Sequence, residues 1–246
     1  MPFPDEHIAA LNVQETTYPP EFFQTFAKEV TVYEDDDIWV VDKPAGLLSV
    51  DGKILKVSLL SRLERANPAV KLIHRLDMDT SGLLIFAKNA AAQTNISKQF
   101  IERLPQKKYQ ARVFGEWESV GATGKISAPV RYEPTTKPRH IVDPDWHKHA
   151  LTLYEILAHE RCHGEDSQDG QEEQMVTRVA LKPVTGRSHQ LRVHMVHCGH
   201  VIIGDSIYAE GQALNIAPRL NLHAQQLRLK HPVLGAWMDW ESPVPF

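Results

Sequence analysis

The chain has 246 residues, which is enough for one large domain or two small ones. Its 42% hydrophobic and 24% charged residues are typical of a globular protein and exclude disorder over the whole chain. No apolar run approaches the roughly 18 residues of a membrane span, and residues 1–18 contain acids but no Lys or Arg, unlike a signal or transit peptide. Because the two cysteines, Cys162 and Cys198, are too few for a disulfide framework, we expect a cytoplasmic protein.

The net charge of −4 does not exclude a nucleic-acid partner, because the acids are unevenly distributed. The stretch 164–174 contains five acids and no Lys or Arg, and without these acids the formal charge would be +1. Basic residues gather elsewhere, at Lys98, Arg103, Lys107, Lys108 and Arg112, and again at Arg131, Lys137, Arg139 and His140. Binding of RNA depends on the local field more than on the total charge, although such residues are also typical of a solvated surface of mixed charge.

The hydrophobic pattern predicts strands and helices that do not alternate regularly. A polar extension over 1–30 contains one short amphipathic piece at 22–27. In chain order there follow a strand at 38–41, a helix at 55–66, a strand at 83–87, a helix at 89–102, strands at 108–116, 151–156 and 175–181, a helix at 187–198 and a strand at 222–229. Asn89 is a suitable N-cap for the second helix, and Gly199 is a suitable residue to follow the third.

Several of these strands lie close enough in the sequence to pair antiparallel. We therefore expect an α+β fold in which helices pack on a mixed, mainly antiparallel sheet. The segment 1–30 is expected to be an N-terminal extension, followed by one domain over 31–246. The acidic stretch 164–174 is expected to be an exposed loop.

One block rich in functional groups, residues 74–82, lies directly before the apolar run 83–87. Catalytic groups are often placed in loops next to rigid elements. An Asp in this loop, Asp77 or Asp79, could act as a nucleophile or as a general base. The same residues could equally serve to cap a turn, as Asp often does.

A second block, residues 185–195, begins with a Gly turn and enters a predicted helix. Ser188 and Arg192 are four residues apart, so they are expected to share one face of that helix. A helix start that presents Arg side chains and backbone N–H groups suits an anion. An ordinary surface helix with a polar face would show a similar pattern.

Four other motifs fail on inspection. The Ser81 insertion breaks the Asp-Thr-Gly tripeptide of aspartic proteases, and residues 121–125 lack the flanking residues of a phosphate loop. Residues 186–190 lack the closing Gly of a nucleophile elbow. The histidines at 189, 194, 197 and 200 have neither a His-Glu-x-x-His nor a Cys-x-x-Cys pattern beside them. The sequence therefore predicts no metal site.

Together, the two blocks closely resemble motifs of the RluA family of RNA pseudouridine synthases. His74-Arg75-Leu76-Asp77, followed by Thr80-Ser81-Gly82, resembles the catalytic motif of that family. Lys108-Tyr109 with Ala111-Arg112-Val113 is similar to the second motif, which supplies an active-site Tyr. Further similar stretches are Thr185 to His194, which matches the Arg-bearing third motif, Asp42 to Leu48, Gly204-Asp205 with Tyr208, and Leu222-His223-Ala224.

The likeness extends from about Val32 to the C-terminus and implies the pseudouridine synthase fold, with a central sheet, flanking helices and loops around an active-site cleft. It implies no separate RNA-binding domain of the S4 type before residue 31. Within the family, the likeness is greatest to members that act on both rRNA and tRNA. The stretches that support this are 46–50, 74–78, 182–190 and 217–220.

The resemblance implies a reaction that isomerises uridine to pseudouridine within RNA and that requires no cofactor and no metal. Asp77 would be the essential carboxylate, either as a nucleophile at the ribose C1′ or as a base at the sugar. Arg192 would be its partner, and a nearby Arg would lower the pKa of the carboxyl. Tyr109 would stack on the uracil and accept or relay the C5 proton.

The implied partner is a structured RNA, either 23S rRNA, the tRNA anticodon stem-loop or both. Arg75 could fill the space that the uridine leaves when it is taken out of its stack. Lys137, Arg139 and His140 could clamp a stem-loop from a Pro-containing loop. The other residues expected to contact RNA are His74, Lys108 and Arg187.

Two other functions stay open from the residues alone. One is an RNA-binding protein without activity, and the other is a nucleoside hydrolase that uses Asp77. Free uracil as a product would indicate hydrolysis, whereas a retained base would indicate isomerisation. We expect a monomer that binds no membrane.

Overall fold

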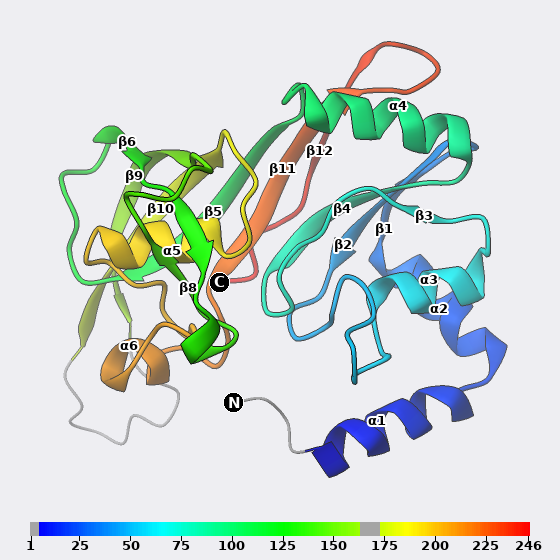
Figure 1. The fold of residues 1–246 in the computed structure, drawn as a ribbon, viewed down its shortest axis with the longest axis horizontal. Helices are drawn as coiled ribbons and strands as arrows, with labels where there is room; N and C mark the ends of the chain where they lie inside the picture. The colour runs from blue at the N-terminus through cyan, green and yellow to red at the C-terminus, as the bar shows by residue number, and fades with distance from the viewer. Residues whose placement is uncertain (1–4, 163–172) are drawn as a thin grey trace. The chain divides into compact units, whose positions relative to one another are not determined.

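The computed structural model describes residues 5–162 and 173–246, and these form two compact units. The first unit is Met1–Gln106 with Gln226–Pro243, and the second is Lys107–Gln225 with Val244–Phe246. Each unit therefore contains segments that are far apart in the sequence (Figure 1).

The first unit has helices on a sheet in the order β1-β2-β4-β11, where β3 also pairs with β4 and β12 with β11. Its helices are α1 (Asp5–Thr17), α2 (Pro20–Val30), α3 (Leu59–Ala66) and α4 (Ala90–Ile101). Its strands are β1 (Thr31–Glu34), β2 (Ile38–Lys43), β3 (Lys71–Leu72), β4 (Ser81–Ala87), the last residues of β11 (Leu222–Lys230) and β12 (Trp237–Glu241).

Strands β2 and β4 form the centre of this unit, as their apolar runs predict. All seven residues of β4 are buried, and its residues Leu83 and Ile85 pack with Ile38 and Val40 of β2. Helix α4 adds Ile96 to the same cluster. Burial of each such side chain stabilises the fold by about 1.5–3 kcal/mol, so the loop that leads into β4 is attached to a fully buried core strand.

The starts of two helices in this unit show how caps decide helix boundaries. Asn89 caps α4 as predicted, because its side chain accepts a hydrogen bond from the backbone N–H of Ala92. The predicted helix over 55–66 begins at Leu59 instead of Leu55, so that prediction is wrong at its start. Ser58 accepts from the backbone N–H of Ser61 in a capping box, which fixes the first turn there.

The amphipathic piece predicted at 22–27 is part of the longer helix α2, which buries Phe23, Ala27 and Val30. Helix α2 packs against α3. Helix α1 is attached to α3 by Glu15, whose carboxylate accepts two hydrogen bonds from Arg62 at 2.7 and 2.8 Å. Residues 5–30 thus form two packed helices, and the sequence predicted only part of the second.

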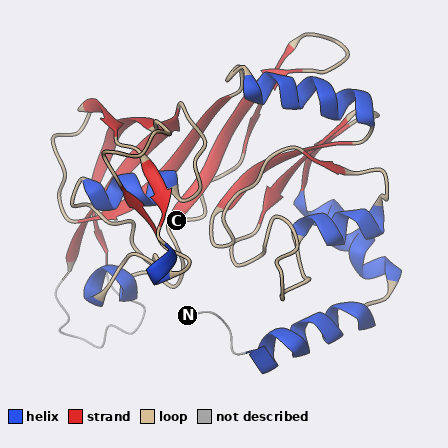
Figure 2. Ribbon diagram, viewed as in Figure 1, coloured by secondary structure: helices blue, strands red, loops and turns tan. Residues whose placement is uncertain are grey.

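The second unit consists mostly of strands, with short helices beside them (Figure 2). The sheet order is β11-β5-β10-β9-β6, and β7 and β8 form a separate hairpin. The strands are β5 (Gln106–Phe114), β6 (Thr123–Ser127), β7 (Val130–Tyr132), β8 (His140–Val142), β9 (Leu151–Cys162) and β10 (Gln174–Pro183). The helices are the 3-10 turn η1 (Pro134–Thr136), α5 (Gln190–His197) and α6 (Gly211–Asn215).

Helix α5 begins three residues later than the predicted helix over 187–198. His189 has a left-handed backbone with φ of 55°, and Gln190 turns its side chain back to accept from Thr185 Oγ1 and from the N–H of Arg187. Ser188 therefore lies outside the helix, and the prediction that it shares a helix face with Arg192 is wrong. The helix ends before Gly199, which has φ of 80° as expected of a residue in that position.

The α+β prediction is confirmed. The strand pairs β1–β2, β2–β4, β5–β10, β9–β10, β6–β9, β7–β8 and β11–β12 are all antiparallel. Of the acidic stretch predicted as a loop, residues 164–172 lie outside the described residues, whereas Glu173 pairs with Arg161 at 2.7 Å. Among the helices that the structure describes, none is both long and apolar enough to cross a membrane.

Candidate active site

Hydrogen bonds hold the backbone of the Asp77 loop at Leu76 and at Asp77 itself. Ser49 Oγ donates to the carbonyl of Leu76 at 2.7 Å and accepts from its N–H at 3.0 Å. On the other side, the N–H of Thr80 bonds the carbonyl of Asp77 at 3.2 Å and closes a turn. The backbone of Asp77 is thereby fixed while its side chain stays half-buried.

A buried lysine also holds the Asp77 loop through a backbone carbonyl. Lys43, at the end of β2, is fully buried, and its ammonium donates to the carbonyls of Pro44, Leu47 and Met78 at 2.7–2.8 Å. A buried ammonium needs such acceptors, because desolvation without partners is costly. The contact with Met78 connects the residue after Asp77 to the core strand β2.

His74 and Arg75, earlier in the same loop, have different environments. His74 stacks on Phe100 with ring centroids 4.7 Å apart, and its Nε2 accepts from the N–H of Ile85 at 3.4 Å. Its ring therefore supports the packing of the loop on β4 and α4. Arg75 is exposed, so its guanidinium is available to a ligand at the surface.

Strand β5 presents Tyr109 and Lys107 on one face and Lys108 on the other. Tyr109 is 8% exposed, and residues 107, 109 and 111 share one face because side chains alternate along a strand. Lys107 therefore lies on the face of Tyr109, and its ammonium reaches the Thr185–Gly186 turn, whereas Lys108, the expected RNA contact, lies on the opposite face. Burial lowers the pKa of Lys107. The alternation of the strand could have pointed to Lys107.

Arg192 forms a buried ion pair that the sequence did not predict. Its Nε and Nη2 donate to Asp205 at 2.8 and 2.6 Å, and the two side chains are 2% and 1% exposed. Asp205 Oδ1 also accepts from the backbone N–H groups of Ile207 and Tyr208. This two-point pairing fixes the plane of the guanidinium on α5.

The turn before Asp205 requires glycine. Gly204 has φ of +69°, and a Cβ atom there would lie 2.0 Å from the carbonyl oxygen of Arg219. Only a residue without a side chain permits that approach. The pattern Gly204-Asp205 thus has a local cause, since the close contact sets where the carboxylate of Asp205 meets Arg192.

Three other basic residues expected to bind RNA, Lys137, Arg139 and Arg187, lie in two places in the second unit. Lys137 is exposed and Arg139 is about two-fifths exposed, both between β7 and β8. Arg187 is half-buried before α5 and donates to the carbonyl of His149 at 3.3 Å. Of the predicted catalytic residues, Asp77 belongs to the first unit, whereas Tyr109 and Arg192 belong to the second.

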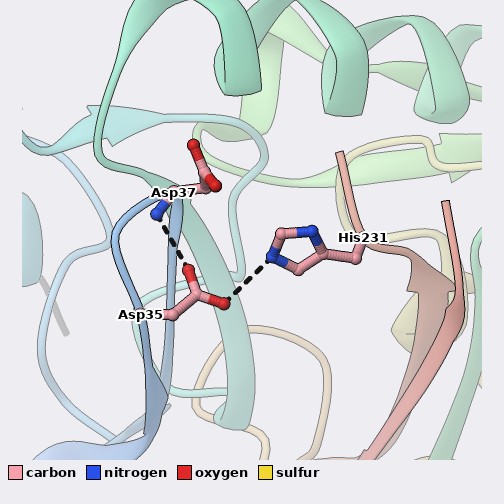
Figure 3. A group of neighbouring side chains, drawn as sticks. All are labelled: Asp35, Asp37 and His231. Carbon is pink, nitrogen blue, oxygen red and sulfur yellow. Dashed lines mark hydrogen bonds and ion pairs between the residues drawn. The ribbon is translucent and has the colours of Figure 1, made fainter. Parts of the chain in front are cut away.

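One group of possible metal ligands occurs among the described residues, and the sequence did not single it out. The ligand atoms of Asp35, Asp37 and His231 lie within 4.8 Å of one another. His231 Nδ1 accepts from the N–H groups of Val233 and Leu234, so Nε2 carries the proton and donates to Asp35 at 2.9 Å. The carboxylate of Asp37 points away from this hydrogen bond (Figure 3).

Hydrogen bonds within the protein already account for this group. Asp35 accepts from the N–H groups of Asp37 and Ile38, and Asn89 donates to Asp37 at 2.8 Å. Burial of Asp35 opposes its ionisation, but the hydrogen bonds outweigh that effect and lower its pKa. The arrangement closes the β1–β2 turn and attaches it to the hairpin of β11 and β12, and no cation is needed to explain it.

Comparison with known proteins identifies relatives over most of the chain. The family model for RNA pseudouridylate synthase matches residues 37–197. The dual-specificity RNA pseudouridine synthase RluA of Escherichia coli K12 is 42% identical over 219 residues, which cover 88% of this chain and 94% of that protein. The enzyme of the same name from Pasteurella multocida is 41% identical over 217 residues, with 87% and 93% coverage.

Solved structures agree with these matches. Human RNA Pseudouridylate Synthase Domain Containing 1 has a TM-score of 0.73 and 29% identity, over 88% of this chain and 83% of that one. Human RNA Pseudouridylate Synthase Domain Containing 4 shares the fold, with a TM-score of 0.67 and 22% identity over 92% and 93% of the two chains. The chain therefore belongs to the RNA pseudouridine synthase family, and it is an enzyme that isomerises uridine to pseudouridine within RNA.

Proposed function

We propose that this enzyme modifies uridines in both rRNA and tRNA, in the cytoplasm, and that Asp77, Tyr109 and Arg192 carry the reaction. The proposal that both RNA classes are substrates rests on the 42% identity, over 88% of the chain, to synthases named for dual specificity. The proposed targets are 23S rRNA and the tRNA anticodon stem-loop. No cofactor is required, because the base is neither gained nor lost.

The reaction needs a uridine outside its stack, since the ribose C1′ cannot be reached within it. The bond between C1′ and N1 breaks, the uracil turns, and C5 bonds to C1′. The proton leaves C5, and N1 ends with a proton. Asp77 is proposed to act at the sugar, as a nucleophile at C1′ or as a base, and its fixed backbone supports such a role.

Arg192 is proposed as the charged partner of the Asp77 carboxylate. Two hydrogen bonds to Asp205 hold its guanidinium, so little conformational entropy would be lost when it meets the carboxylate. Tyr109 is proposed to stack on the turned uracil and to accept or relay the C5 proton. Tyr109 is buried on the face that it shares with Lys107, and this supports a stacking role for its ring in a place protected from solvent.

The RNA would be held by basic residues around these groups. Arg75 is proposed to occupy the space of the displaced uridine, which its exposure supports. Lys137 and Arg139 are proposed to contact the phosphates of a stem-loop. We also propose weaker RNA contacts by His74, Lys108 and Arg187. For His74 and Arg187 the reason is that their side chains already bond within the protein.

The substrate proposal is tested by tritium release from C5-labelled uridine. The RNAs are a 23S rRNA fragment, an anticodon stem-loop and a fully paired duplex as control. We expect release from the first two, with the base still attached to the RNA. Release from only one would contradict dual specificity. Free uracil would indicate a hydrolase, and binding without release would indicate an inactive RNA-binding protein.

A further inference from the structure

Tyr208 lies where three parts of the second unit meet: the β7–β8 hairpin (residues 130–142), the start of α5 and the Asp205 turn. The mechanism above assigns it no role. Tyr208 packs against a small hydrophobic cluster that includes Val130 of the hairpin and Val193 of α5. The same residue therefore touches the hairpin that carries Lys137 and Arg139 and the helix that carries Arg192.

The hydroxyl of Tyr208 bonds on two sides. It accepts from the backbone N–H of His140, the first residue of β8, at 2.8 Å. It also lies 2.8 Å from Nδ1 of His189, the residue that precedes α5. The rings of His140 and His189 lie 4.7 Å apart, so the hydroxyl closes a compact contact between the hairpin and the start of the helix.

The rest of Tyr208 faces the arginines. Its ring centroid lies 5.2 Å from Cζ of Arg192 and 5.8 Å from Cζ of Arg139. Its backbone N–H donates to Asp205 Oδ1, the same oxygen that accepts from Arg192 Nη2. Removal of the hydroxyl would leave these contacts intact, whereas removal of the ring would take away the surface beside Arg192.

We propose that Tyr208 is a positioning residue that couples the β7–β8 hairpin to Arg192. Its hydroxyl sets the hairpin against the start of α5, and its ring and backbone hold Arg192 and Asp205. The inference rests on the proposed RNA contacts of the hairpin and on the proposed role of Arg192. The hydroxyl of Tyr208 should then affect RNA affinity, whereas its ring should affect the reaction rate of the bound complex.

The test measures single-turnover kinetics on an anticodon stem-loop, giving the half-saturating enzyme concentration and the rate at saturation. Tyr208→Phe should raise the half-saturating concentration about fivefold, because the hydroxyl's bonds to His140 and His189 are both lost, with the saturated rate within about twofold of wild type. In a Lys137→Ala, Arg139→Ala background, the same change should have no further effect, because the hairpin then has no RNA contacts to position.

Tyr132→Phe is the matched control, because it removes a phenol hydroxyl from the same hairpin at an exposed position. It should behave as wild type. A Tyr208→Phe effect of equal size in both backgrounds, or none in either, would overturn the coupling. If the Lys137→Ala, Arg139→Ala protein binds RNA as wild type does, the proposed contacts of the hairpin fail, and the coupling fails with them.

Tyr208→Leu tests the second part of the proposal. It keeps an apolar side chain against Val193 but removes the ring from Arg192. The saturated rate should fall at least tenfold, while a circular dichroism spectrum and thermal midpoint like those of Tyr208→Phe would show that the fold is kept. A saturated rate equal to that of Tyr208→Phe in a folded protein would refute the role of the ring.

Discussion

At the scale of single residues, the pair of Arg192 and Asp205 has the largest predicted consequence. Both side chains are almost fully buried, so Asp205→Asn would leave a guanidinium without its counter-charge. Breaking a buried pair in this way costs about 3–5 kcal/mol. We expect a loss of that size in the free energy of unfolding, measured by urea denaturation, together with a strong loss of activity.

The control for this prediction is Asp239→Asn. Asp239 pairs with Arg228 at 3.4 Å, but the two side chains are 68% and 44% exposed. Exposed pairs contribute about 1 kcal/mol or less. Equal losses in the two variants would contradict the view that burial makes the pair of Arg192 and Asp205 important.

Asp35 gives a prediction for the pH dependence of stability. Its pKa is lowered in the folded protein, so the ionised carboxyl stabilises the fold above the unfolded pKa of about 4, and this contribution is lost as pH falls through the lower folded pKa. At neutral pH, the free energy of unfolding of wild type should exceed that of Asp35→Asn by about 1–2 kcal/mol. Urea denaturation across a pH series should show this difference shrinking below about pH 4. A constant difference would contradict the assignment.

At the scale of elements, the loop before β4 depends on Ser49. Ser49→Ala would remove both hydrogen bonds to the backbone of Leu76 while leaving nearly the same volume. Unsatisfied buried groups of this kind cost about 1–3 kcal/mol. We expect a drop in the saturated single-turnover rate of about tenfold with a smaller change in RNA affinity, because Asp77 would lose its fixed position.

Ser97→Ala, in helix α4, is the comparison for Ser49→Ala. It makes the same serine-to-alanine change, but at a half-buried position of a helix, whereas Ser49 is buried and bonds the Asp77 loop. Its rate should match that of wild type. A similar loss in the two variants would show that the effect is a general loss of stability and not a movement of the loop.

The elements also show what the sequence could predict. Strands β2 and β4 were predictable because continuous apolar runs report burial on both faces. The starts of α3 and α5 were not, because Ser58 and Gln190 set them through local hydrogen bonds that compete with helical spacing. Strands β6, β7 and β8 are short and partly exposed, so pairing rather than hydrophobic pattern defines them.

At the scale of the whole molecule, the fold class and the family followed from the sequence, since three motifs with matching residues are specific. The contacts of the candidate site did not. Asp205 is thirteen residues from Arg192, and its role depends on a turn that Gly204 makes possible. Lys107 and Lys108 are adjacent and chemically alike, so residue type does not separate them, whereas the alternation along β5 does.

The central claim is that Asp77 carries the isomerisation, and Asp77→Asn against Asp79→Asn tests it most directly. The two variants make the same small change in the same loop, two residues apart. The measurement is pseudouridine formed in one turnover on an anticodon stem-loop, with RNA binding as a second readout. The account predicts no detectable product from Asp77→Asn, a rate within about tenfold of wild type from Asp79→Asn, and similar RNA binding by both. Product from Asp77→Asn at the rate of Asp79→Asn would contradict it.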